Sequence, residues 1–102
     1  MRKELDHEEL FELEEIYKAF GSMPRLRILI RLREGEATVG ELTEAAGLSQ
    51  SATSHQLKEL RMKNIIKSRK NGLNIFYSLR DSHIFRMIES GMEHIKGEQC
   101  DE

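Results

Sequence analysis

Hydrophobic side chains recur at intervals of three and four residues along most of the chain, and this spacing predicts amphipathic helices. The first helix is predicted to end at Gly21, and residues 1–9, before its apolar stripe, are predicted to form an N-terminal tail. A second helix is predicted to begin after the N-cap residue Ser22 and to end at Gly35. The two stripes consist of Leu10, Leu13, Tyr17 and Phe20, and of Leu26, Leu29, Ile30 and Leu32.

Two shorter helices are predicted over residues 38–63. Thr38 and Glu41 fit a capping box, in which each side chain accepts a hydrogen bond from the other residue's backbone, so a third helix starts there. This helix is predicted to end before Gly47, and Ser49 is a suitable N-cap for a fourth helix that runs to about Lys63. Two short helices joined by a tight turn are typical of a helix-turn-helix.

The pattern then changes to β-branched and aromatic residues, which predicts the strands Ile65–Arg69 and Asn74–Leu79. They are separated by a segment that contains Asn71 and Gly72, a pair that favours a tight hairpin turn. Residues 65–79 are therefore predicted to form a small β-hairpin, the wing, beside the helix-turn-helix.

A fifth helix is predicted over residues 81–96, capped by Asp81 or Ser82, and residues 97–102 are predicted to form a tail. Its apolar stripe is long for a small domain, which suggests a dimerisation helix; it consists of Ile84, Met87, Ile88, Met92 and Ile95. The predicted fold is mainly α with a small β-hairpin wing. We expect one dimeric winged helix-turn-helix domain that spans residues 1–102.

Composition narrows the class of protein. A chain of 102 residues forms a single domain, and its apolar runs are far too short to cross a membrane, so we expect a soluble, cytoplasmic protein. Its one cysteine excludes an internal disulfide and Cys-x-x-Cys redox chemistry. Ser54 and His55 point about 100° apart on a helix and cannot form a nucleophile–base pair. No phosphate-binding loop or His-Glu-x-x-His motif is present, and we predict that the protein is not an enzyme.

Charge is segregated along the chain despite a formal net charge of only −2. Residues 49–80 contain seven basic side chains and one acidic side chain, Glu59, and the acidic excess lies outside this segment. A compact basic region on an acidic body indicates a polyanionic partner.

The fourth helix carries polar residues where a helix-turn-helix meets duplex DNA. Its first turns place Gln50, Ser51, Ser54 and His55 on one face, and the residues predicted to face the core are Ala52, Leu57 and Leu60. Gln can form two hydrogen bonds with adenine, and Ser hydroxyls can reach bases or phosphates. Further basic residues are expected toward the wing, where they would contact DNA phosphates; the candidates are Lys63, Lys67, Arg69 and Lys70.

Three stretches of the chain resemble the sequence of a known protein family. They are Pro-Arg-Leu-Arg-Ile-Leu (24–29), residues 41–60, which include Leu-Ser-Gln-Ser and Ser-His, and Ile-Phe-Tyr-Ser-Leu (75–79). Together they resemble the ArsR/SmtB family of bacterial metal-sensing repressors, over residues 16–96. The resemblance implies a homodimeric repressor that leaves a palindromic double-stranded DNA operator when an inducer binds. It also places Gln50, Ser51, Ser54 and His55 at positions that contact DNA.

The thiolate and imidazole side chains that metals prefer limit where an inducer metal could bind this chain. A Cys-x-Cys pair at the start of the third helix serves some family members, but residues 38–40 contain no thiolate, which disfavours soft metals there. On the fifth helix, His83 and His94 share a face but lie roughly 16 Å apart along the axis, too far for one ion.

Two antiparallel copies of the fifth helix would solve this problem of distance. Asp81 and His83 of one chain would then meet His94 and Glu98 of the other, a nitrogen and oxygen ligand set that suits zinc, with cobalt as an alternative. This arrangement resembles the family's interfacial zinc site, except that Gly97 stands where a His or Glu ligand is usual. The fourth ligand is open among Glu98, Cys100, water or none. His7, in the N-terminal tail, could also reach the site, although its spacing does not require this.

Two alternatives to a metal sensor remain open from the sequence. The first is an ArsR-like DNA-binding repressor with no metal site, regulated by another ligand or by a partner. The second is a dimeric interaction module whose acidic segment, Glu4–Glu15, binds a basic partner.

Overall fold

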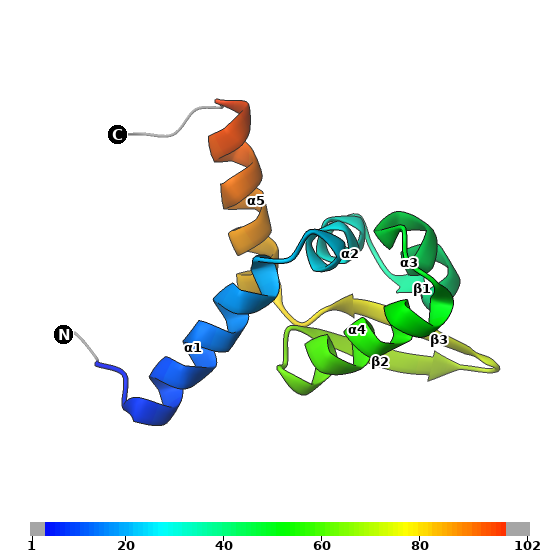
Figure 1. Ribbon diagram of the computed structural model, residues 1–102, viewed down its shortest axis with the longest axis horizontal. Helices are drawn as coiled ribbons and strands as arrows, with labels where there is room; N and C mark the ends of the chain where they lie inside the picture. Colours follow the sequence, from blue (N-terminus) through cyan, green and yellow to red (C-terminus); the bar gives the residue numbers. More distant parts are fainter. Residues whose placement is uncertain (1–3, 98–102) are drawn as a thin grey trace.

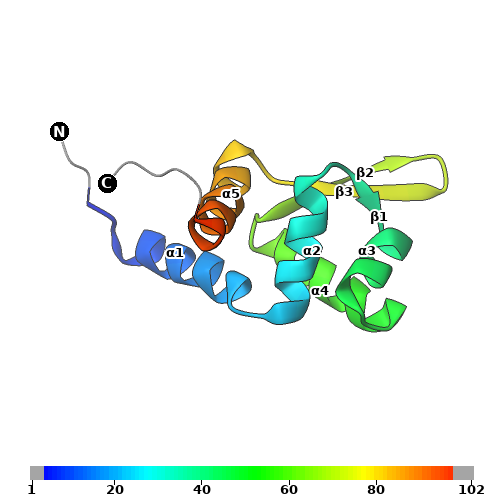
Figure 2. The ribbon, with the colours of Figure 1, turned by 90° about the horizontal axis from the view of Figure 1, so that it is seen from above.

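The computed structural model describes residues 4–97. The elements, in chain order, are α1 (His7–Phe20), α2 (Met23–Arg33), β1 (Ala37–Thr38), α3 (Val39–Ala46), α4 (Gln50–Met62), β2 (Ile66–Asn71), β3 (Asn74–Leu79) and α5 (Ser82–Lys96). Helices α1 and α5 lie at one end of the molecule, and the β2–β3 hairpin projects from the other (Figures 1 and 2). The predicted fold, mainly α with a hairpin wing beside a helix-turn-helix, is confirmed.

The first helix begins at His7, so the prediction of a tail over residues 1–9 is wrong for its last three residues. The reason is a capping box at the start of α1. The Asp6 carboxylate accepts a hydrogen bond from the Glu9 backbone N–H at 2.8 Å, and the Glu9 carboxylate accepts one from Asp6 at 3.0 Å. These bonds satisfy backbone donors at the helix start, and the negative charges favour that end of the helix dipole.

The helix-turn-helix is bounded by the caps that the sequence predicted. Thr38 and Glu41 form the predicted capping box of α3, and Ser49 caps α4 by accepting a hydrogen bond from Ala52 N–H at 3.1 Å. Gly47 ends α3 with φ of 71°, in the left-handed region that glycine enters without strain. These features fix the short turn that sets α4 at an angle to α3.

The wing is part of a three-stranded antiparallel sheet in the order β1-β3-β2. The hairpin pairs from Ile66 opposite Leu79 to Asn71 opposite Asn74, which leaves Gly72 and Leu73 as a two-residue turn. Strand β1, which the sequence did not predict, adds only two register pairs to β3. The hairpin beyond β1 therefore extends from the body with little backbone support on that side.

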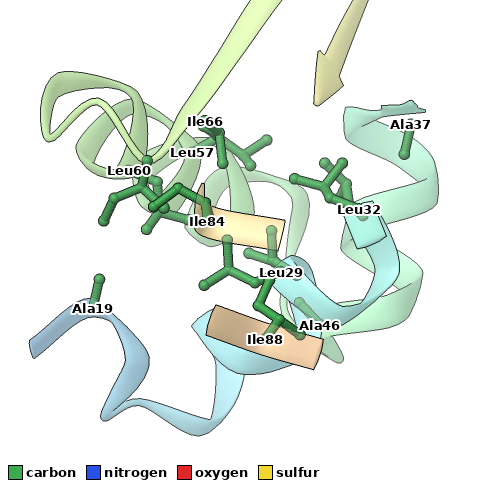
Figure 3. Close-up of a cluster of buried hydrophobic side chains, with 13 residues drawn as sticks. Ala19, Leu29, Leu32, Ala37, Ala46, Leu57, Leu60, Ile66, Ile84 and Ile88 are labelled. Carbon is green, nitrogen blue, oxygen red and sulfur yellow. The ribbon is translucent and has the colours of Figure 1, made fainter. Parts of the chain in front are cut away.

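The hydrophobic core lies where α2, α3, α4 and α5 meet the base of the sheet (Figure 3). Helix α4 contributes Leu57 and Leu60, and the start of β2 continues the core with Ile65 and Ile66, all of them buried. Burial of one side of α4 leaves its opposite side open to solvent. No helix within residues 4–97 combines the length and the apolar content needed to cross a membrane.

Candidate nucleic-acid interface

The N-terminal half of α4 presents a polar face to solvent. Gln50, Ser51, Ser54 and His55, which we call the exposed α4 face, are all exposed, as their spacing predicted. The opposite side of the same turns carries Thr53, which is fully buried and whose hydroxyl donates to the Ser49 carbonyl at 2.9 Å. A helix with one face anchored in the core and the other polar and open has the form that fits a DNA major groove.

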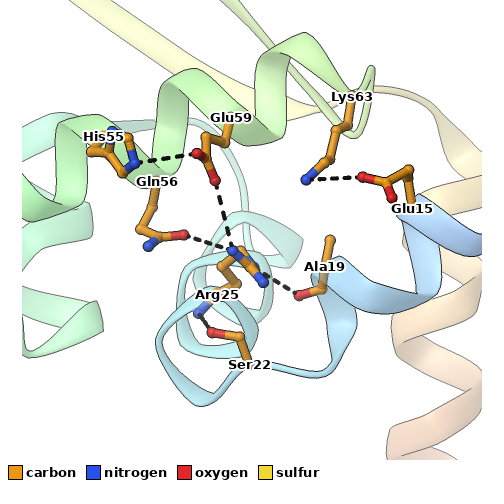
Figure 4. Close-up of polar contacts among 8 residues, drawn as sticks. All are labelled: Glu15, Ala19, Ser22, Arg25, His55, Gln56, Glu59 and Lys63. Atoms are coloured by element: carbon orange, nitrogen blue, oxygen red, sulfur yellow. Dashed lines mark hydrogen bonds and ion pairs between the residues drawn. The ribbon is translucent and has the colours of Figure 1, made fainter.

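A polar network behind this face ties α4 to the α1–α2 corner (Figure 4). The Arg25 guanidinium donates to the Gln56 side-chain oxygen at 3.1 Å and to the Ala19 carbonyl at 3.3 Å. It also lies 3.9 Å from the Glu59 carboxylate. Arg25 thus joins the end of α1 and the start of α2 to α4. Its partners on α4 are the residue after His55 and the residue one turn later. The sequence does not single out Arg25, because its partners on α4 are distant along the chain.

His55 is partly engaged by its own helix. Its Nε2 atom lies 3.2 Å from the Glu59 carboxylate one turn later, while most of the imidazole stays exposed. This exposed contact places the ring beside Glu59 at the edge of the exposed α4 face. The predicted DNA-contacting histidine is therefore accessible to solvent.

Lys63 is placed away from the exposed α4 face. It is the C-cap residue of α4, about 20 Å along the helix from Gln50, and its ammonium lies 3.3 Å from the Glu15 carboxylate on α1 (Figure 4). The expectation that Lys63 lies toward the wing is wrong, because the chain turns back at the end of α4 beside α1. The ion pair instead helps hold α1 against α4.

Two of the basic residues predicted toward the wing, Arg69 and Lys70, have different surroundings. Arg69 donates two hydrogen bonds to the Glu36 carboxylate, at 2.7 and 2.8 Å, and its guanidinium lies 4.9 Å from the centre of the Phe76 ring. These hydrogen bonds hold the pKa of Glu36 below its ordinary value and raise the pKa of Arg69. Lys70 is exposed near the hairpin turn and has no ion pair within residues 4–97. Lys70 is the freer of the two cations.

Three of the candidate metal ligands, Asp81, His83 and His94, are exposed on α5 or at its N-cap. One oxygen of Asp81 caps the helix by accepting hydrogen bonds from the backbone N–H groups of His83 and Ile84, at 3.0 and 3.1 Å. The Ile84 bond is the main reason that the pKa of Asp81 lies below its ordinary value. The other Asp81 oxygen lies 3.5 Å from His83 Nδ1.

His94 is exposed in the last turns of the same helix, and Glu98 lies outside the described residues. Within residues 4–97 of one chain, no three His, Cys, Asp or Glu side chains are placed to hold a metal ion together. Asp81 and His83 are brought together at one end of α5, and His94 is not brought to them within a single chain.

Known proteins share this architecture. The family profile described as "Bacterial regulatory protein, arsR family" matches residues 24–68, which include the helix-turn-helix. The Synechocystis protein named transcriptional repressor SmtB homolog is 34% identical over 83% of this chain, and the match spans 64% of that protein. The Mycobacterium tuberculosis regulator NmtR is 36% identical over 88% of this chain and 75% of its own length.

A solved structure extends the similarity to three dimensions. The crystal structure of the AntR antimony-specific transcriptional repressor has a TM-score of 0.78 and 32% identity, over 94% of this chain and 87% of that one. The sequence profile, the related proteins and the fold agree with one another. The chain belongs to the ArsR/SmtB family of winged helix-turn-helix transcriptional regulators, a family of DNA-binding proteins and not of enzymes.

Proposed function

We propose that this chain is a transcriptional repressor that binds a palindromic DNA operator as a homodimer, through the exposed α4 face. The single observation that carries the proposal is the arrangement of α4, polar and open on one side and anchored by Leu57 and Leu60 on the other. A related protein named as a transcriptional repressor supports it. In a symmetric dimer the two α4 helices would enter successive major grooves about 34 Å apart.

The proposed contacts divide into those that select the sequence and those that hold the duplex. Gln50 can pair with adenine, and Ser51, Ser54 and His55 can reach neighbouring base edges or phosphates. Lys70 near the wing turn supplies a free positive charge for the phosphate backbone. Lys63 lies beside α1 and is not among the proposed phosphate contacts.

Selection from a random pool of duplexes, followed by fluorescence anisotropy, tests DNA binding. We expect enrichment of a palindrome with half-sites about 10 base pairs apart. The logarithm of the association constant for this palindrome should fall linearly with the logarithm of the salt concentration. The slope should be about 0.9 for each phosphate neutralised. A shuffled duplex of equal length is the control. A pool without enrichment, or equal binding to both duplexes, would contradict the proposal.

We propose further that zinc, with cobalt as an alternative, is the inducer and binds between antiparallel copies of α5. Asp81 and His83 of one chain would hold the ion with His94 and Glu98 of the partner subunit. The donor chemistry fits, because imidazole and carboxylate ligands suit tetrahedral zinc and both side chains at the start of α5 face solvent. A similar solved structure is of an antimony-specific repressor, so responses to metals or metalloids occur among relatives.

The mechanism depends on the position of α5 rather than on any reaction. A bound ion supplies a cross-link between subunits. Asp81 fixes the first turn of α5 through its capping oxygen and leaves its second oxygen and His83 for the ion. Buried Ile84 and Ile88 attach the same helix to the core that carries α4. A shift of α5 against its partner therefore changes the spacing of the two α4 helices and weakens operator binding.

Replacing both His83 and His94 by alanine should abolish the zinc response. In the unaltered protein we expect saturating zinc to weaken operator binding at least about tenfold, which corresponds to about 1.4 kcal/mol of coupling. In the double variant we expect the change to be less than about twofold, with operator affinity in the absence of zinc retained. Anisotropy with and without zinc measures both.

His7→Ala is the matched control, since it removes a histidine from α1 and should leave the response intact. Cobalt binding gives an independent measurement, because a tetrahedral site has an intense visible spectrum that His83→Ala or His94→Ala should remove. The same titration of Glu98→Ala tests the fourth ligand. Unchanged operator affinity at saturating zinc would remove the metal proposal and favour a repressor regulated by another ligand.

A further inference from the structure

The Arg69 side chain links two strands that are not neighbours. In the order β1-β3-β2, the outer strands β1 and β2 both pair with β3 and not with each other. Arg69 lies on β2, and Glu36 immediately precedes β1. The hydrogen bonds of 2.7 and 2.8 Å between them therefore reach across the central strand. We call this pair the strap.

Phe76 forms the surface on which the strap lies. It is paired in register with Arg69 on one side and with Thr38, two residues after Glu36, on the other. The Arg69 guanidinium is 4.9 Å from the ring centre, within the range of a cation–π contact. A planar guanidinium that makes two parallel hydrogen bonds and covers an aromatic ring has little freedom to rotate.

The strap acts where the backbone support of the wing is weakest. Strand β1 contributes only two residues to the sheet, and the hairpin continues beyond it to Lys70 and the Gly72–Leu73 turn. Glu36 belongs to the connection between α2 and β1, which is continuous with α3. The strap thus ties the outer strand of the wing to the connection that leads into the helix-turn-helix.

We propose that Glu36 and Arg69 are positioning residues that set the angle of the wing, so that Lys70 and the turn reach the DNA backbone. Arg69 is then not itself a phosphate contact, contrary to the expectation from its charge. This inference rests on the proposed DNA binding. It concerns two residues that pair with each other in the absence of DNA.

Glu36→Ala gives a test in which charge and geometry act in opposite directions. Removal of a carboxylate near a polyanion should tighten binding, whereas loss of the strap should weaken it. We expect Glu36→Ala to weaken binding of the selected duplex about two- to fivefold. Glu34→Ala is the matched control, because Glu34 is exposed, carries the same charge two residues earlier and forms no ion pair within residues 4–97. Glu34→Ala should leave the affinity for the selected duplex unchanged or slightly increase it.

Arg69→Ala should weaken binding at least as much as Glu36→Ala does, because it loses the same strap and also a positive charge. The double variant should be no weaker than Arg69→Ala. The slope of affinity against salt should stay the same in Arg69→Ala. The charge-exchanged variant E36R/R69E should recover most of the lost affinity, although it places an acid on β2. Each of three results would overturn the strap. The first is tighter DNA binding by Glu36→Ala. The second is a salt slope reduced by about 0.9 in Arg69→Ala, and the third is a further loss of DNA affinity in the exchanged variant.

Amide hydrogen exchange separates this inference from the proposed function, because it needs no DNA. In Glu36→Ala we expect faster exchange of β1 and hairpin amides, with the core of α4 unchanged. Unchanged hairpin exchange would refute the strap. If the unaltered protein bound no duplex, the proposed function would fail, while the exchange result would still decide whether Glu36 holds the wing.

Discussion

Replacing Leu60 by alanine should lower the free energy of unfolding by about 2–5 kcal/mol. Leu60 is fully buried on the core side of α4, in the cluster that also contains Ile66 and Ile84 (Figure 3). Because a protein interior is closely packed, truncation leaves a cavity that the neighbouring side chains fill only in part. The loss is a large share of the 5–15 kcal/mol that is typical of a whole domain.

Urea unfolding at a fixed protein concentration measures this change, since dimerisation would make the apparent stability depend on concentration. Leu73→Ala is a matched control: it makes the same chemical change at a side chain that is 101% exposed, against 0% for Leu60. We expect a change within about 0.5 kcal/mol for Leu73→Ala. Similar effects of the two substitutions would contradict the assignment of Leu60 to the core.

Helix ends were predictable because capping is local. Thr38 and Glu41 are three residues apart, Ser49 bonds to Ala52, and Asp81 bonds to Ile84, so each interaction lies within one turn of the chain. The capping box of Asp6 and Glu9 is equally local. It was missed because the prediction followed the apolar stripe, which begins only at Leu10.

Contacts between distant segments were not predictable from this sequence. Arg25 and Gln56 are 31 residues apart, and Glu36 and Arg69 are 33 residues apart. Many opposite charges in the chain could form such pairs, and only the packing of α2 on α4 and the register of β1, β3 and β2 select these. The two-residue strand β1 is too short to produce an alternating pattern.

The candidate site was predicted unevenly for the same reason. Helical spacing correctly grouped the exposed α4 face, but a small error in helix phase assigned Ala52 to the core in place of the buried Thr53. Charge alone suggested equal roles for Lys63, Lys67, Arg69 and Lys70, whereas the fold pairs Lys63 and Arg69 with carboxylates of other segments. Which cations remain free depends on tertiary contacts that composition does not record.

Ser54→Glu should weaken operator binding at least about 100-fold without unfolding the protein. Ser54 is exposed at the centre of the proposed contact surface, so its substitution should change stability by no more than about 0.5 kcal/mol. A carboxylate carried into the major groove would lie close to phosphates and would lose its hydration without a partner. Such like-charge contacts cost several kcal/mol, and each 1.4 kcal/mol is about tenfold in affinity.

Ser54→Gln separates charge from size, since glutamine has nearly the volume of glutamate but no charge. We expect Ser54→Gln to retain much more affinity than Ser54→Glu at low salt, and the difference between them to shrink as salt screens the added charge. Anisotropy at several salt concentrations measures both variants, and thermal unfolding verifies that both are folded. Wild-type affinity in Ser54→Glu would show that α4 does not enter the groove through this face, whereas equal large losses in both variants would assign the effect to bulk rather than charge.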